Sequence, residues 1–147
     1  MGSYLNPGNK GFQESLNSEI YVDKTGLIEK TNAVLDTRQK FLCVSRPRRF
    51  GKSMAADMLA AYYERGEDSE PLFEALEISK ADSYEIYRNQ YDVIKVNMQE
   101  FLSMTHSMDD MLALPTDTIH YLLCQCYVFF CAAAAFFEFH NRLAAVL

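Results

Sequence analysis

The sequence predicts an α/β fold in which parallel strands are flanked by helices. Two short apolar runs, residues 41–45 (FLCVS) and 91–98 (YDVIKVNM), are typical of strands, and apolar residues at helical spacing lie before and between them. Strands that are separated by helical crossovers pair in parallel, because a tight turn cannot return the chain in the same direction. The 147 residues are enough for a domain with a substantial core.

Composition places most of the chain among soluble globular proteins. Hydrophobic residues make up 49% and charged residues 23%, and the formal net charge of −6 argues against a general nucleic-acid binder. Residues 1–10 contain no apolar run behind a basic start, and the four cysteines are unevenly placed. We therefore expect neither a secretory signal nor a disulfide framework, and the reducing cytoplasm is the expected compartment.

The first elements are predicted from turn signals and from helical spacing. Residues 6–9 (NPGN) mark turns, so about the first ten residues are expected to form a loop. Residues 19–23 (EIYVD) fit either a short strand or an extended lead-in. A helix follows, with Asp23 or Thr25 as the candidate N-cap, and its apolar positions are Leu27, Ile28, Thr31, Val34 and Leu35.

The later elements are short helices that lead to the second strand. An amphipathic helix is expected from Lys52 to Gly66, where the glycine ends it. Residues 71–78 (PLFEALEI) predict a short helix, and Asp82 with Glu85 forms a capping pair for another. The second strand follows, and a further turn of helix is expected after it.

The most informative stretch is residues 41–54 (FLCVSRPRRFGKSM), in which a strand is expected to lead through a tight loop into a helix. Gly51 lets the backbone approach a phosphate closely, because it has no side chain. Lys52 would bring its ammonium to the β- and γ-phosphates, and Ser53 would offer its hydroxyl to Mg²⁺. With the N–H groups at the helix start, the stretch predicts a phosphate-binding (Walker A) loop.

One position departs from the general pattern of such loops, because Arg46 stands where a first glycine is usual. The whole string RPRRFGKS, preceded by residues 21–30 (YVDKTGLIEK), strongly resembles the AAA-ATPase-like family of bacterial proteins, whose members carry Arg-Pro-Arg-Arg-Phe in this loop. The resemblance covers residues 4–111 and includes residues 55–66 (AADMLAAYYERG) and 72–79 (LFEALEIS).

The resemblance implies a P-loop domain that uses ATP and Mg²⁺, which family members join to a C-terminal nuclease-like domain of the PD-(D/E)XK type. It implies that Gly51, Lys52 and Ser53 bind the ATP phosphates and Mg²⁺, with Ser53 as the metal ligand. The expected nucleotide-binding residues are Arg46, Arg48, Arg49, Phe50, Gly51, Lys52, Ser53 and Met54.

ATP hydrolysis by such domains needs a second acidic site, an apolar strand that ends in Asp or Asp-Glu. Strand 91–98 has its acid, Asp92, at its start instead, and Asp109 and Asp110 follow a polar stretch. In the family, the acidic strand lies further along the chain than residue 111. We therefore expect ATP binding with weak or no hydrolysis.

Several charged residues have simpler interpretations beside a functional one. Arg46, Arg48 and Arg49 could form a solvated loop, a nucleic-acid patch or charge support for a bound triphosphate, and the acidic net charge gives no strong nucleic-acid signal. Lys24, next to Asp23, could lie near the nucleotide, although a surface salt bridge or a helix cap is the simpler role. The three histidines lack the spacing of metal ligands.

Residues 112–147 differ sharply in composition from the rest of the chain. Only Asp117, Glu138 and Arg142 carry a formal charge there, and residues 119–137 form an uncharged apolar run. This run is long enough for a membrane-spanning helix. We infer from the change in composition that the tail is not the family's own sequence, as a shifted reading frame or a truncated and fused gene would produce. A membrane anchor and a buried C-terminal helix are the alternatives.

The predicted organisation is a partial P-loop NTPase (AAA-like) domain over residues 1–111, followed by an apolar helical tail over residues 112–147. The expected function is ATP binding through the loop. The alternative is a non-catalytic interaction or membrane-tethered module, with an anion-binding basic loop and an anchor over residues 119–137. The sequence indicates no oligomeric state.

Overall fold

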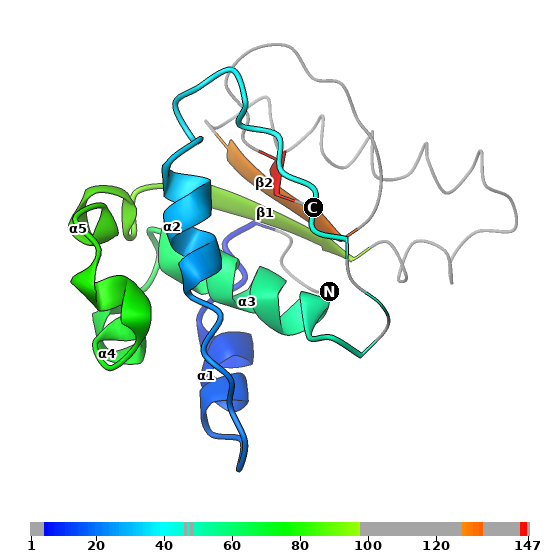
Figure 1. Cartoon of the computed structure of the whole chain (residues 1–147), viewed down its shortest axis with the longest axis vertical. Helices are drawn as coiled ribbons and strands as arrows, with labels where there is room; N and C mark the ends of the chain where they lie inside the picture. The colour runs from blue at the N-terminus through cyan, green and yellow to red at the C-terminus, as the bar shows by residue number, and fades with distance from the viewer. Residues whose placement is uncertain (1–4, 46, 48, 98–127, 134–144, 147) are drawn as a thin grey trace, which may run out of the picture.

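A computed structural model describes residues 5–45, 47, 49–97, 128–133 and 145–146. Along the chain, a series of short helices around one longer helix precedes the strands (Figure 1). The elements are α1 (Lys10–Leu16), α2 (Gly26–Asn32), α3 (Lys52–Tyr63), α4 (Glu70–Phe73), the 3-10 helix η1 (Glu77–Lys80), α5 (Tyr84–Tyr87), β1 (Asp92–Asn97), β2 (Val128–Ala133) and β3 (Ala145–Val146).

The three described strands form a parallel sheet in the order β1-β2-β3. The register begins with Asp92 of β1 opposite Val128 of β2. On the other edge of β1, Leu5 forms an antiparallel bridge with Ile94. The mixture of helices and parallel strands is that of an α/β domain, as the sequence predicts.

The prediction of a buried strand over residues 41–45 is wrong, because the structure has no strand there. Among them, Leu42 alone has a bridge to a neighbouring segment, and both Phe41 and Cys43 are exposed. The edges of β1 are occupied by β2 on one side and by Leu5 on the other, so this segment has no place beside β1. So short an apolar run carries no periodicity that could have revealed its exposure.

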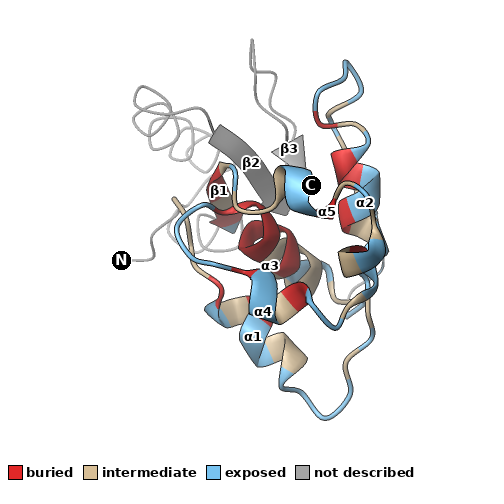
Figure 2. Ribbon diagram, turned by 90° about the vertical axis from the view of Figure 1, so that its left-hand side faces the viewer, coloured by how far each residue is buried: buried red, intermediate tan, exposed pale blue. Residues whose placement is uncertain are grey.

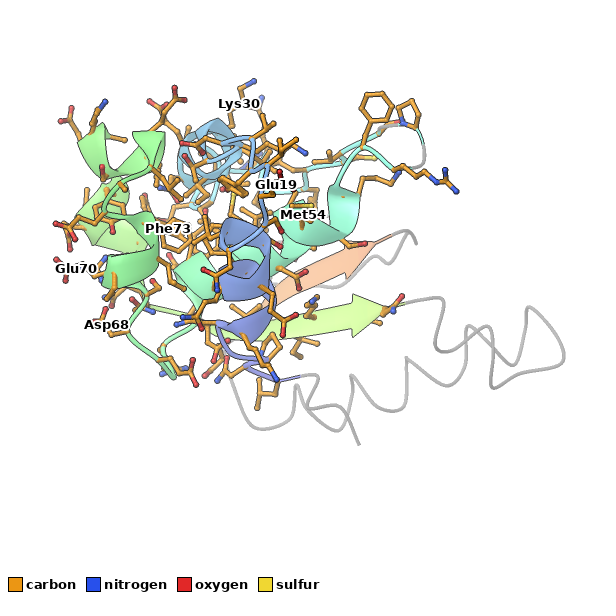
Figure 3. All side chains as sticks on the ribbon, turned by 90° about the horizontal axis from the view of Figure 1, so that it is seen from below. Glu19, Lys30, Met54, Asp68, Glu70 and Phe73 are labelled. Carbon is orange, nitrogen blue, oxygen red and sulfur yellow. The ribbon has the colours of Figure 1, made fainter. Side chains whose placement is uncertain are left out.

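Helix α3 lies against the sheet and runs antiparallel to β1 (Figure 3). Glu64, just after the helix, forms a bridge with Tyr91, just before the strand. In the middle of the helix, Asp57 forms an ion pair with Lys95, further along β1. The amino end of α3 therefore lies toward the carboxyl ends of the parallel strands, the edge at which open α/β sheets bind ligands.

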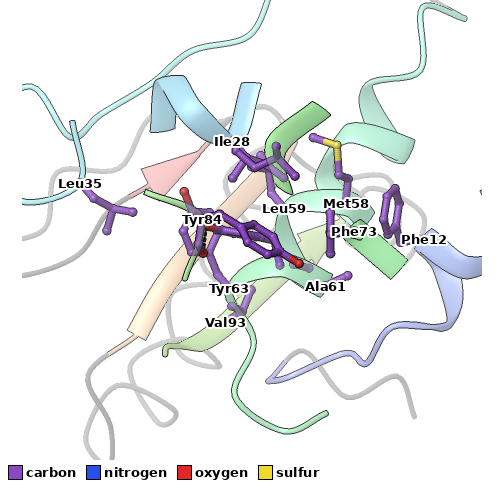
Figure 4. Packing of buried hydrophobic residues seen from close by; sticks show 13 residues of the cluster. Phe12, Ile28, Leu35, Met58, Leu59, Ala61, Tyr63, Phe73, Tyr84 and Val93 are labelled. Carbon is purple, nitrogen blue, oxygen red and sulfur yellow. Dashed lines mark hydrogen bonds between the residues drawn. The ribbon is translucent and has the colours of Figure 1, made fainter. Parts of the chain in front are cut away.

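The core lies around α3 and is built mainly from aromatic rings. Figure 2 shows buried residues concentrated on α3, and Figure 4 shows how the neighbouring side chains pack against it. Phe12 of α1 stacks on Phe73 of α4 with ring centroids 4.9 Å apart, and Tyr62 of α3 meets Phe73 edge-on at 5.5 Å. Such rings bury large apolar areas, so they hold the small surrounding helices to α3.

Two helix boundaries differ from the prediction for identifiable reasons. Helix α1 was not expected, because Phe12 is its one buried residue and leaves no apolar periodicity to detect. Helix α3 ends at Tyr63 and not at Gly66. The backbone turns away there because the N–H of Arg65 donates to the carbonyl oxygen of Tyr91 at 3.0 Å.

Other expected elements are confirmed with changes in detail. Helix α2 begins after Thr25, one of its two candidate N-caps, and residues 19–23 form the extended lead-in and no strand. Helix α5 has Ser83 at its N-cap, so the predicted capping by Asp82 is wrong. The Ser83 hydroxyl instead accepts a hydrogen bond from the side-chain amide of Asn32 at 3.1 Å.

The prediction of a helical C-terminal tail is wrong for part of its length. Within the apolar run expected to be helical, Val128–Ala133 forms a strand. An uncharged apolar run is compatible with a helix or with a buried strand, and its Val and Phe residues favour the strand. Among the described residues, no helix has the length and apolarity needed to cross a membrane. Apart from β2 and β3, the predicted tail over residues 112–147 lies outside the described residues.

Candidate functional site

The predicted phosphate-binding loop leads into the amino end of α3. Gly51 is the N-cap of this helix and adopts a left-handed backbone, with φ of 72° and ψ of 32°. Arg49, two residues earlier, is also left-handed, with φ of 68°. This conformation costs an ordinary residue about 1–2 kcal/mol and glycine almost nothing, which explains the glycine at the turn into the helix.

Lys52 and Ser53, the first two residues of α3, are exposed. The Lys52 side chain folds back over the loop, and its Nζ donates a hydrogen bond to the carbonyl oxygen of Pro47 at 3.1 Å. The backbone N–H groups of a first helical turn carry the positive end of the helix dipole. The site therefore combines an ammonium group, a hydroxyl group and a helix start within a few residues.

The other predicted loop residues differ in how far they are exposed and in what they contact. The Phe50 side chain is 62% exposed, so it does not pack into the core. The Met54 sulfur lies 3.6 Å from the position that a Cβ at Gly51 would occupy, so it packs against the glycine. Arg46 and Arg48 lie outside the described residues.

Lys24 is the residue whose place the sequence did not establish. Its Nζ donates a hydrogen bond to the carbonyl oxygen of Phe50 at 3.2 Å. The same Nζ lies only 2.6 Å from the position that a Cβ at Gly51 would occupy. The structure thus brings a second ammonium group to the loop from a segment far from it in sequence. From the sequence, a place near the nucleotide was one interpretation of Lys24, and a surface salt bridge or a helix cap was the simpler one.

Asp23, the neighbour of Lys24, has a structural role. Its carboxylate accepts hydrogen bonds from the N–H and hydroxyl of Thr25, at 2.8 and 2.7 Å, and from the N–H of Glu77 at 2.8 Å. Partial burial raises the pKa of Asp23, but these bonds outweigh the burial and leave its pKa below the ordinary value. The carboxylate therefore fixes the chain just before α2 against η1.

The acid of β1 lies at the opposite end of α3 from the loop. Asp92 begins β1 and accepts hydrogen bonds from the guanidinium of Arg65, with Nε donating at 2.7 Å. The side-chain amide of Asn6 also donates to Asp92, at 3.1 Å. In this position, the carboxylate joins the end of α3 to the start of β1, and it does not belong to the loop.

The exposed hydroxyl of Ser53 at the helix start is compatible with a phosphate-bound Mg²⁺. This ion takes hard oxygen ligands, keeps several waters and is often held largely by substrate phosphates. Within the described residues, no group of three or more His, Cys, Asp or Glu side chains could hold a metal ion. The residues present thus fit a metal that arrives with a phosphate ligand.

Comparison with known proteins places the chain in a family. A family model described as a predicted AAA-ATPase matches residues 8–128, which includes the whole loop and α3. The match extends past residue 111, the expected end of the resemblance, whereas the predicted division into two parts there stays a prediction. No curated protein and no solved structure matches the chain. Because the family model covers most of the sequence, the chain belongs to the AAA-ATPase-like family.

Proposed function

We propose that the chain binds the phosphates of ATP, together with Mg²⁺, at the amino end of α3. The observation that carries this proposal is the arrangement at Gly51, where a left-handed glycine opens the helix and the exposed Lys52 ammonium lies over the loop. Family membership supports the same use, because the family is described as a predicted AAA-ATPase.

The binding would exchange neutral partners for charged ones. In the structure, Lys52 donates to the neutral carbonyl oxygen of Pro47. A phosphate oxygen is a stronger acceptor for an ammonium group, because its negative charge adds direct Coulomb attraction to the hydrogen bond. Ser53 would hold the Mg²⁺, which when bound would neutralise phosphate charge, and the first-turn N–H groups would complete the anion site.

We expect this chain to bind ATP with weak or no hydrolysis. Hydrolysis requires an acid near the γ-phosphate that holds the metal or orients the attacking water. Among the described strands, Asp92 is the one acid, and it lies at the amino end of β1 in contact with Arg65. From that position it serves the junction of α3 and β1 and leaves the loop without a strand carboxylate from the described residues.

A titration of the chain with Mg²⁺-ATP tests the proposal, with Lys52→Ala beside it. We expect the variant to bind at least about tenfold more weakly, a loss of about 1.4 kcal/mol. Lys30→Ala is the matched control, because Lys30 is an exposed lysine on α2. Equal affinities for the parent chain, Lys30→Ala and Lys52→Ala would contradict the proposal, as would a parent chain that does not bind.

A further inference from the structure

The loop receives an ammonium group from outside the motif, and this suggests a larger site than the motif describes. We propose that Lys24 is a second phosphate-binding residue of the loop and contacts the polyphosphate of the nucleotide together with Lys52. This inference rests on the proposed function, because it assigns a further residue to the same site.

The first support is the position of the Lys24 ammonium. It donates to the carbonyl oxygen of Phe50, the residue before Gly51, at 3.2 Å. Lys52 donates to the carbonyl oxygen of Pro47, nearer the start of the loop. The two ammonium groups therefore lie against two different carbonyl oxygens of the described loop, and an ammonium group can also donate to a phosphate oxygen.

The second support is the charge of Lys24. Among the described residues, Lys24 has no carboxylate within ion-pair distance, and its side chain is exposed. The neighbouring Asp23 carboxylate is directed at the N–H groups of Thr25 and Glu77. The positive charge of Lys24 is thus not neutralised by its sequence neighbour, and it adds to the positive potential at the helix start.

The third support is that the segment carrying Lys24 is fixed. Just after Lys24, the Thr25 hydroxyl accepts a hydrogen bond from the N–H of Ile78 at 3.2 Å. At the other end of α2, a buried hydrogen bond of 2.5 Å joins Thr31 to Tyr63 of α3. These bonds fix α2 to α3, the helix that follows the loop. Lys24 is therefore already held next to the loop before a ligand binds, so that binding costs little backbone freedom.

The glycine at position 51 leaves room for the Lys24 ammonium beside the loop. A Cβ there would lie 2.6 Å from the Lys24 nitrogen, so the flexible end of the lysine would have to move aside. The left-handed turn favours glycine at this position, and the same glycine lets the Lys24 ammonium lie directly against the loop.

The test compares Lys24→Gln with the parent chain, with Lys30→Ala as the surface-lysine control and Lys52→Ala as the control for the loop itself. Glutamine keeps a polar side chain with hydrogen-bond donors but carries no charge, and the unfolding measurement below separates a structural role of Lys24 from an electrostatic one. The probes are Mg²⁺-ATP and inorganic tripolyphosphate, which has no base or sugar. Thermal unfolding of each variant establishes that the chain is folded.

We expect Lys24→Gln to weaken the binding of both probes by about five- to tenfold at low salt, with an unchanged unfolding temperature. The difference from the parent should shrink at about 1 M salt, where charges are screened within about 3 Å. If Lys52→Ala weakens binding but Lys24→Gln binds like Lys30→Ala, the role of Lys24 is overturned and the proposed function stands. If the parent binds neither probe, both proposals are overturned.

Discussion

The two ends of helix α3 differ in burial and in what holds them. At the amino end, Lys52 and Ser53 are exposed, and the ammonium groups of Lys24 and Lys52 donate hydrogen bonds to carbonyl oxygens of the loop. At the carboxyl end, Tyr62 and Tyr63 are fully buried and their hydroxyl groups take part in hydrogen bonds to neighbouring helices. One end is therefore open to a ligand, and the other is part of the core.

One helix can therefore serve both stability and binding. The buried end fixes the helix through aromatic packing and hydrogen bonds, so the exposed end can present polar groups to a ligand. Substitutions at the buried end should change the free energy of unfolding. Substitutions at the exposed end should change ligand affinity with little effect on stability.

The largest effect is expected from Tyr63→Ala at the buried end. The Tyr63 ring is fully buried and meets Tyr62 and Tyr91 edge-on, at 4.8 and 5.7 Å between centroids. Truncating a buried aromatic side chain leaves a cavity and costs about 3–5 kcal/mol of stability. Denaturant unfolding of the variant and the parent measures this loss.

Tyr63→Phe gives a milder version of the same test if the alanine variant does not fold. It keeps the ring but removes the hydroxyl that donates to Asn32 at 2.6 Å and shares a hydrogen bond with Thr31. Leaving buried polar groups without a partner costs about 1–3 kcal/mol. A phenylalanine variant as stable as the parent would show that the hydrogen bonds at this end do not fix α2 to α3.

The next effect is expected from Gly51→Ala at the exposed end. The left-handed backbone there should cost alanine about 1–2 kcal/mol, and the added Cβ would lie 2.6 Å from Lys24 Nζ. We therefore expect a modest loss of stability together with about tenfold weaker Mg²⁺-ATP binding. Thermal unfolding and a binding titration measure the two changes separately.

A double variant shows which part of the Gly51→Ala effect comes from the lysine. In a Lys24→Ala background, the steric conflict is absent and only the backbone cost of alanine remains. The affinity loss caused by Gly51→Ala should then be smaller than in the parent. Equal losses in both backgrounds would mean that Lys24 does not approach the glycine in solution.

A smaller effect, of opposite sign at two acids, is expected from pH. Burial raises the pKa of Glu64, although the hydrogen bond from the N–H of Gly8 at 2.7 Å partly offsets it, whereas the hydrogen bonds to Asp23 leave its pKa lowered. The folded state thus binds a proton at Glu64 more tightly than the unfolded state does, so ionising Glu64 lowers stability as the pH rises through this range. For Asp23 the stabilisation is present above the ordinary pKa and is lost as the pH falls.

Two neutral variants measure these opposite slopes. Relative to the parent, Glu64→Gln should become more stable as the pH rises from about 4 to 7, because the variant has no charge to bury. The disadvantage of Asp23→Asn relative to the parent should shrink as the pH falls below about 5, because the parent then protonates the carboxylate that its folded state keeps ionised. Parallel pH profiles for the two variants would contradict the assigned environments.

Part of this organisation could be predicted from the sequence, because it depends on local patterns. Helix α2, helix α3 and strand β1 have enough apolar periodicity or β-forming residues to be recognised, and Gly51-Lys52-Ser53 marks the start of α3.

The rest could not be predicted, because it depends on contacts between distant segments. Residues 41–45 contain a strand-like composition, but the sheet offers them no edge beside β1. Lys24 reaches the loop only because the buried contacts of Thr25 and Thr31 fix α2 in the fold. Nor could an uncharged run reveal that Val128–Ala133 pairs with β1, since periodicity is uninformative where every residue is apolar.

The smallest effect on stability is expected from Ser53→Ala, and it tests the exposed end most specifically. Ser53 is exposed on the first turn of α3, so its substitution should change the free energy of unfolding by less than about 0.5 kcal/mol. If its hydroxyl binds Mg²⁺, ATP affinity should fall several-fold in the presence of Mg²⁺ and stay unchanged in EDTA. Ser53→Thr keeps the hydroxyl and should bind like the parent. A loss of affinity in EDTA as large as that in Mg²⁺ would show that Ser53 contributes to the loop without binding the metal.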